Sequence, residues 1–141
     1  MADTIRIESG EKRILVNDDE NRVITFNPHD ILFTERFYNL LSNFDAKAKE
    51  FSQKADEIGL DENDLDDNGI PKKTGEVIAL TREVCEYMRA QIDHVFGEGT
   101  SQAAFGDMNT LNMFEQFFEG ITPFIQKERT AKVQKYQKGK R

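Results

Sequence analysis

Apolar residues recur at helical spacing along two long stretches of the chain. In the first stretch they stand at Phe33, Phe37, Leu40, Leu41, Phe44, Phe51, Ala55 and Ile58; in the second they stand at Val77, Leu80, Val84, Met88, Ile92 and Val95. Steps of three, four and seven residues place these side chains on one face of a helix. The pattern therefore predicts two amphipathic helices. Gly59 is expected to end the first, and the second is expected to run from Thr74 to Gly97.

The first of these helices carries start signals in its sequence. Asn27 suits the N-cap and Pro28 the first helical position, and Phe26 and Ile31 are spaced as a hydrophobic staple. We therefore expect the helix to begin at Pro28. The polar pair at residues 42–43 offers a place where it can break and a second helix can start.

The first 27 residues favour strands. Thr4–Glu8 alternates apolar and polar residues, residues 13–16 are short and apolar, and residues 22–26 are rich in β-branched side chains. Turn-forming residues separate these segments. The pattern predicts a meander of two or three strands. Because a bare hairpin is marginal in water, it must pack on the helices or on another subunit.

A phenylalanine-rich segment lies near the carboxyl end. A last helix is expected from about Thr110, after a loop over residues 98–109 that Phe105 anchors. Gly120 and Pro123 are unfavourable inside a helix, so we expect a kink or break there, with Thr122 capping a second segment.

The apolar arc of this last helix is wider than one packing face needs. Such an arc is either deeply buried or shared with a partner chain. Core packing is an equally good interpretation, above all for Phe114, Phe118 and Ile121, which share one face. The candidate partner-binding residues are Phe114, Phe117, Phe118, Ile121, Phe124 and Ile125.

Charge is unevenly distributed along the 141 residues. The net charge is −7, but residues 127–141 hold seven basic residues and one acidic residue. The candidate basic-tail residues are Lys127, Arg129, Lys132, Lys135 and Lys138. The acidic body disfavours nonspecific binding to nucleic acid, and the tail leaves a local exception open. A solvated helix end explains the same charges without any ligand.

These observations predict one α+β domain over residues 1–141 that is predominantly helical. It comprises a short β element over residues 1–27, a helical body of three to four helices over residues 28–126 with an acidic linker at residues 61–73, and the basic tail over residues 127–141. No apolar run approaches the length of a membrane span, and the first residues lack a signal-peptide pattern, so a cytosolic protein is expected.

The acidic linker holds half of a calcium-binding motif. Asp64, Asp66 and Asn68 stand at alternate positions before Gly69, as in the first half of an EF-hand loop. The second half fails because Gly75 occupies the position of the bidentate glutamate. A turn between two helices explains these residues without a metal ion.

Catalytic groups are sparse. Cys85 lies in a helical apolar pattern and is interpreted as a core thiol. His29 and His94 are the only histidines, and they are interpreted as surface or capping residues. The sequence predicts neither an enzyme nor a protein with a cofactor.

Several segments, taken in order, resemble the tail assembly chaperone family of long-tailed phages and prophages of Gram-positive bacteria. The resemblance covers most of the chain and rests on residues 23–28 leading into residues 37–40, on residues 67–72, on residues 95–101 with residues 105–107, and on residues 114–123 with the lysine-rich end.

The resemblance implies a non-enzymatic protein that binds the tape measure protein before the tail tube forms around it. It also implies a protein of the host cytoplasm that is absent from the mature virion. The phenylalanine-rich segment is the expected surface for the tape measure protein or for self-association. A virion structural or tail-completion protein is a second interpretation. A regulator that uses the basic tail to bind nucleic acid or a host protein is a third.

Overall fold

The chain folds as a β-hairpin followed by helices. The structure is a computed structural model that describes the backbone of residues 2–139 and the side chains of residues 2–126. Over these residues the elements are β1 (Lys12–Val16), β2 (Asp19–Phe26), α1 (Ile31–Ile58), α2 (Thr74–Phe96), α3 (Thr100–Phe105) and α4 (Leu111–Gly139). The predicted α+β class with a dominant helical part is confirmed.

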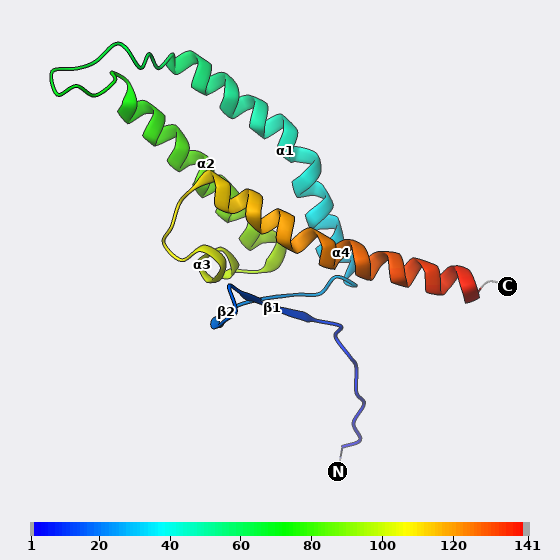
Figure 1. Ribbon diagram of the computed structural model, residues 1–141. Helices are drawn as coiled ribbons and strands as arrows, with labels where there is room; N and C mark the ends of the chain where they lie inside the picture. Colours follow the sequence, from blue (N-terminus) through cyan, green and yellow to red (C-terminus); the bar gives the residue numbers. More distant parts are fainter. Residues whose placement is uncertain (1, 140–141) are drawn as a thin grey trace.

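Helices α1 and α2 form a helical hairpin with the acidic linker at its far end (Figure 1). At the opposite end lie the β-hairpin and the short helix α3. Helix α4 starts beside α2 and runs away from the linker end toward the carboxyl terminus (Figure 1). The hydrophobic core therefore sits at the end where the hairpin, α3 and α4 converge on α2.

The β-hairpin closes through a two-residue turn. Asn17 and Asp18 both adopt left-handed backbone conformations, with φ of 54° and 59°. Asn and Asp tolerate this region better than other residues with a Cβ atom, and the turn matches the twist of the flanking strands. The predicted strand at Thr4–Glu8 is wrong for this structure, because residues 2–11 contain no strand. The described sheet has only β1 and β2, which pair antiparallel.

The start of α1 differs from the prediction. The helix begins at Ile31, and the Asp30 carboxylate caps it by accepting a hydrogen bond of 3.0 Å from the backbone N–H of Leu32. The Asn27 side chain instead accepts from the backbone N–H of His29 at 3.0 Å, so Asn27 to Asp30 form a turn before the helix. The predicted cap at Asn27 is therefore wrong, because the Asn27 side chain is used in this turn and Asp30, an equally suitable capping residue, stands where the helix begins.

The other end of α1 is as predicted. Gly59 takes a left-handed conformation with φ of 63°, and its N–H donates to the carbonyl of Ala55. The helix is continuous through residues 42–43, so the proposed interruption there does not occur. The residues on either side of this pair keep the apolar stripe in phase, and packing outweighs the weak helix propensity of Ser and Asn.

Two further expectations are corrected near the carboxyl end. The predicted loop over residues 98–109 contains helix α3, which the Asp93 carboxylate anchors by accepting from the backbone N–H of Ser101 at 2.8 Å and from its hydroxyl at 3.0 Å. Helix α4 continues through Pro123 without a break. Buried Ile121 and Ile125 hold the helix on both sides of this proline, and their packing offsets the lost backbone hydrogen bond.

The aromatic core centres on Phe96, the last residue of α2. Its ring contacts those of Phe26, Phe33, Phe37 and Phe117, with centroids 5.3 to 6.2 Å apart. The interplanar angles of these four pairs, 69° to 85°, are edge-to-face. One side chain thus joins the hairpin, α1, α2 and α4.

Arg22 attaches the hairpin to α3. Its Nε donates to the carbonyl oxygen of Ala103 at 3.1 Å, and its Nη2 donates to the carbonyl oxygen of Ala104. Carbonyls in the last turn of a helix lack intrahelical partners, so a guanidinium is well placed there.

We expect Arg22→Ala to lower the free energy of unfolding by about 1.5–3 kcal/mol, the usual loss for hydrogen bonds to a charged group. Urea denaturation followed by circular dichroism measures this change. Arg82→Ala, at an exposed position of α2, serves as the matched control and should stay within about 0.5 kcal/mol of the parent. Equal midpoints for the two variants would contradict the assigned role.

Candidate protein-binding groove

An apolar groove of about 760 Å³ lies among α1, α2 and the first turns of α4. We call it the interhelical groove. Helix α1 contributes Leu40, Leu41, Phe44, Ala48, Phe51 and Ala55 to its wall. Few polar groups reach the interior, so the groove suits an apolar ligand surface.

The groove exists because the apolar stripe of α1 is longer than the core that covers it. Within α1 only Phe33, Phe37 and Leu40 are buried. Beyond them Leu41 remains 48% exposed and Phe44 43% exposed. Neighbouring large apolar side chains in one open groove are typical of an interaction surface rather than of isolated exposed residues.

The opposite wall comes from α2 and α4. Helix α2 contributes Val77, Leu80, Val84, Tyr87 and Met88, and α4 contributes Leu111, Phe114 and Phe118. Phe114 is buried and packs edge-to-face on Phe105 of α3, with centroids 5.1 Å apart. This wall is therefore fixed to the core, whereas the α1 wall beyond Leu40 has no buried residue.

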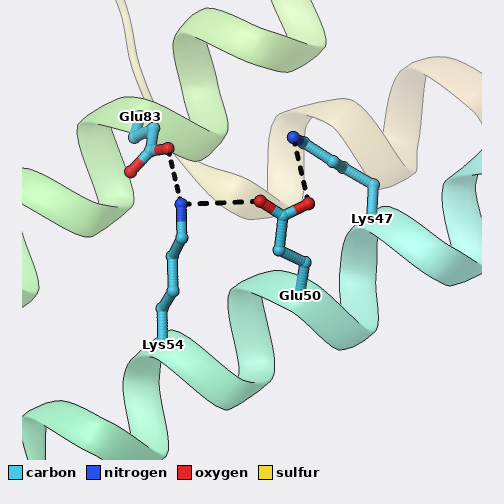
Figure 2. A network of polar contacts seen from close by, with 4 residues as sticks. All are labelled: Lys47, Glu50, Lys54 and Glu83. Carbon is cyan, nitrogen blue, oxygen red and sulfur yellow. Dashed lines mark hydrogen bonds and ion pairs between the residues drawn. The ribbon is translucent and has the colours of Figure 1, made fainter.

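A charged network ties α1 to α2 beside the groove (Figure 2). The Lys54 ammonium lies 3.0 Å from a Glu83 carboxylate oxygen of α2 and 3.6 Å from Glu50 of its own helix. Glu50 in turn lies 3.2 Å from the ammonium of Lys47. The four side chains alternate in sign along the edge where the two helices meet.

The network also shifts the pKa of two of its members, Glu50 and Lys54. The hydrogen bond from Lys47, followed by the positive charge of the same residue, lowers the pKa of Glu50 below its ordinary value. The hydrogen bond to Glu83 is the main cause that raises the pKa of Lys54. Both groups therefore stay charged on either side of neutral pH.

Lys47 connects this charged network to the apolar wall. Its ammonium lies 5.3 Å from the centroid of the Phe51 ring and 5.0 Å from that of the Tyr87 ring. These two rings contact each other edge-to-face at 5.9 Å. Cation–π contacts of this kind hold the lysine at the rim. The groove thus has an apolar floor and a polar rim, the usual arrangement of a protein interface.

The structure places the predicted partner-binding residues in different surroundings. Phe114, Ile121 and Ile125 are buried in the core, and Phe117 and Phe118 are half-buried. Only Phe114 and Phe118 reach the interhelical groove. Phe124 is 40% exposed, and the Lys12 ammonium lies 5.9 Å from its ring centroid. The six residues therefore do not form one continuous surface.

Sequence reasoning missed the α1 wall of the groove. The sequence pattern assigns Leu41, Phe44, Phe51 and Ala55 to one apolar helical stripe with Phe33 and does not distinguish buried from exposed positions along it. The length of the stripe could have indicated this exposure. It extends over a 28-residue helix, and the short elements of a small domain cannot cover a helix of that length from end to end. The predicted basic-tail residues, Lys127, Arg129, Lys132, Lys135 and Lys138, lie outside the residues whose side chains the structure describes.

The calcium candidates lie in a hydrogen-bonded turn of the linker. The Asp66 carboxylate accepts from the backbone N–H groups of Asn68 at 2.8 Å and Ile70 at 3.0 Å. Asp64 lies 3.4 Å from the Lys72 ammonium. These contacts use the acidic groups within the turn. In the described part of the chain, no cluster of three or more His, Cys, Asp or Glu side chains is arranged to hold a metal ion.

Cys85 is a buried core residue, as expected. Desolvation is the main cause that raises the pKa of its thiol, so the nucleophilic thiolate is disfavoured. His29 and His94 are exposed.

A second hollow of about 650 Å³ adjoins Cys85 and is lined by apolar and polar side chains of α2, by Gln102 of α3 and by the loop before α4. One of its two arginines, Arg89, donates to the carbonyls of Gly106 and Met108 and to the Asn109 side chain. The guanidinium therefore holds the loop in place.

No helix among the described residues has an apolar run long enough to cross a bilayer. Neither curated protein sequences nor solved structures yield a match to this chain. A family model described as a family of unknown function, DUF6673, matches residues 20–141, from the second residue of β2 to the last residue. With most of its length matched, this chain belongs to the DUF6673 family of proteins of unknown function.

Proposed function

We propose that this protein is a non-enzymatic chaperone that binds an apolar helical segment of a partner protein in the interhelical groove. The observation that carries the proposal is the groove itself, in which Leu41 and Phe44 remain exposed beside the fixed wall of α2 and α4. Burying such side chains against a partner removes apolar surface from water and favours association.

The dimensions of the groove favour a helix as the ligand. The α1 wall runs from Leu40 to Ala55, which corresponds to a length of about 22 Å at the rise of an α-helix. A partner helix of about 15 residues spans this length, and its apolar side chains at every third or fourth position would meet the groove. Charged residues that line the groove, among them Lys47 and Glu115, would accommodate the polar face of such a helix.

The resemblance to tail assembly chaperones identifies the class of partner in this proposal. A tape measure protein is a long helical chain whose apolar stripes need cover before the tail tube forms around them. In this role the protein acts in the cytoplasm of the host bacterium and is left out of the mature virion. The groove supports the proposal because it supplies the kind of cover that such a stripe needs.

Co-expression with the tape measure protein encoded in the same genome tests the proposal. We expect the two proteins to co-purify through an affinity tag on the tape measure protein and to elute together in size-exclusion chromatography. An unrelated helical protein with the same tag is the control. Soluble partners that elute separately would contradict the proposal, and recovery of this protein from purified virions would favour a structural component of the tail instead.

A further inference from the structure

The segment that precedes β1 has the sequence pattern of a strand, but it pairs with no strand among the residues that the structure describes. In Thr4–Glu8 apolar and polar residues alternate, and Ile5 and Ile7 share one face when the chain is extended. Both are almost fully exposed, at 87% and 82%. Figure 1 shows this arm, residues 2–8, running away from the body. Two exposed β-branched side chains on one face of an extended segment favour pairing of that segment with another strand.

The hairpin offers a complementary edge. Strand β1 pairs with β2 on one side, and no third strand adjoins the sheet in the described residues. Ile14 and Val16 of β1 pack against the core from the inner face of the sheet, while Arg13 and Leu15 face outward. An isolated two-stranded sheet is marginal, and an open edge is a template for another strand.

We infer that the arm of one copy pairs antiparallel with β1 of a second copy, and that two copies exchange arms reciprocally. A register that sets Glu8 opposite Arg13 also sets Ile7 opposite Ile14 and brings Ile5 beside Val16. The inner face then carries only apolar pairs, and the outer face carries an ion pair. Register is specified where one face is apolar, and pairs of this kind stabilise antiparallel strands.

The backbone around Gly10 directs the arm away from its own β1. The side chain of Asn27 donates a hydrogen bond through Nδ2 to the carbonyl oxygen of Ser9. Gly10 has φ of 76°, and a Cβ atom there would lie 3.0 Å from Cδ2 of His29. Residues 9 and 10 thus lie against the turn before α1. If the arm paired with β1 of its own chain, residues 10–11 would have to form a tight turn. The contacts of residues 9 and 10 with the turn before α1 hold this part of the chain in a more open conformation.

Exchange of an identical element between two copies through such an open hinge is a low-cost route to a dimer. A second copy of this chain is the expected partner for the β1 edge, because every copy carries both an arm with the matching alternation and an open edge. This inference concerns the hairpin end of the molecule and is independent of the groove and of its proposed ligand.

Two measurements on the full chain test the exchange: sedimentation velocity over a range of concentrations, and hydrogen exchange of the arm amides. We expect a dimer whose arm amides are protected. The variant Ile5→Pro with Ile7→Pro removes two N–H donors and should raise the dimer dissociation constant at least tenfold and abolish protection. Ile5→Val with Ile7→Val keeps the strand pattern and should leave both unchanged.

A hinge variant separates exchange between copies from folding within one chain. Gly10→Asn with Glu11→Gly favours a tight two-residue turn and places a Cβ against His29. It should give a monomer whose arm amides stay protected. A parent chain that is monomeric at all concentrations, with or without protected arm amides, would overturn the inference. A dimer that survives the proline substitutions unchanged would overturn it as well.

Discussion

Phe96→Ala is expected to lower the free energy of unfolding by about 3–5 kcal/mol, the range measured for truncation of a buried aromatic residue. The side chain is 8% exposed and contacts four other rings. Because these rings come from the β-hairpin, α1 and α4, the cavity would loosen three elements around α2 at once. Large losses of stability arise from cavities of this kind.

Urea denaturation followed by circular dichroism measures the effect. Phe96→Leu retains most of the volume and should cost less, which keeps the prediction testable if the alanine variant fails to fold. Tyr38→Ala removes an aromatic side chain of α1 that is 69% exposed and should change stability by no more than about 0.5 kcal/mol. A Phe96→Ala variant as stable as Tyr38→Ala would show that the aromatic cluster does not hold the core together.

Leu41→Asp combined with Phe44→Asp is expected to weaken binding of the tape measure protein at least about 30-fold. The reason is that the substitutions would remove the binding free energy that hot-spot side chains contribute to an interface. Both residues line the interhelical groove and are more than two-fifths exposed. Carboxylates at these positions would have to be desolvated by an apolar ligand. The fold should survive, since neither side chain belongs to the buried core.

Titration calorimetry with the co-purified tape measure protein measures this loss. Tyr38→Asp with Asn39→Asp is the matched control, because it introduces the same two charges on the same helix at exposed positions that do not line the groove. The control should bind as the parent does. Equal binding by the groove variant and the control would exclude the groove as the binding surface, even if the two proteins still associate.

Much of the fold could be predicted from local patterns. The three- and four-residue spacing predicted α1 and α2, and the ends at Gly59 and Gly97 are observed. These features depend on short-range effects, namely helical periodicity and the need for a residue that ends a helix without strain. The anchoring role of Phe105 was also visible, because a single aromatic residue in a polar segment seldom stays exposed; it is buried among the rings of α4.

Other features were decided by packing. A kink or a break was expected at Pro123, yet α4 has no break there, with Ile121 and Ile125 buried on either side. The strand expected at Thr4–Glu8 does not form, because pairing depends on a neighbour that local sequence does not specify. Asn27 and Asp30 are both suitable N-cap residues, so local sequence does not choose between them. The path of the chain places Asp30 at the start of α1, and Asp30 therefore caps the helix.

The sequence by itself determined which residues are apolar, which helical face they share and where α1 and α2 end. Only the tertiary structure decided which parts of those faces are covered. Phe33 and Phe37 are buried against the Phe96 ring of α2, and Phe33 also packs on Phe26 of β2, whereas Leu41 and Phe44 on the same stripe border an open groove. The physical reason is that periodicity sets the direction of a side chain, while burial depends on how far the neighbouring elements reach along the helix.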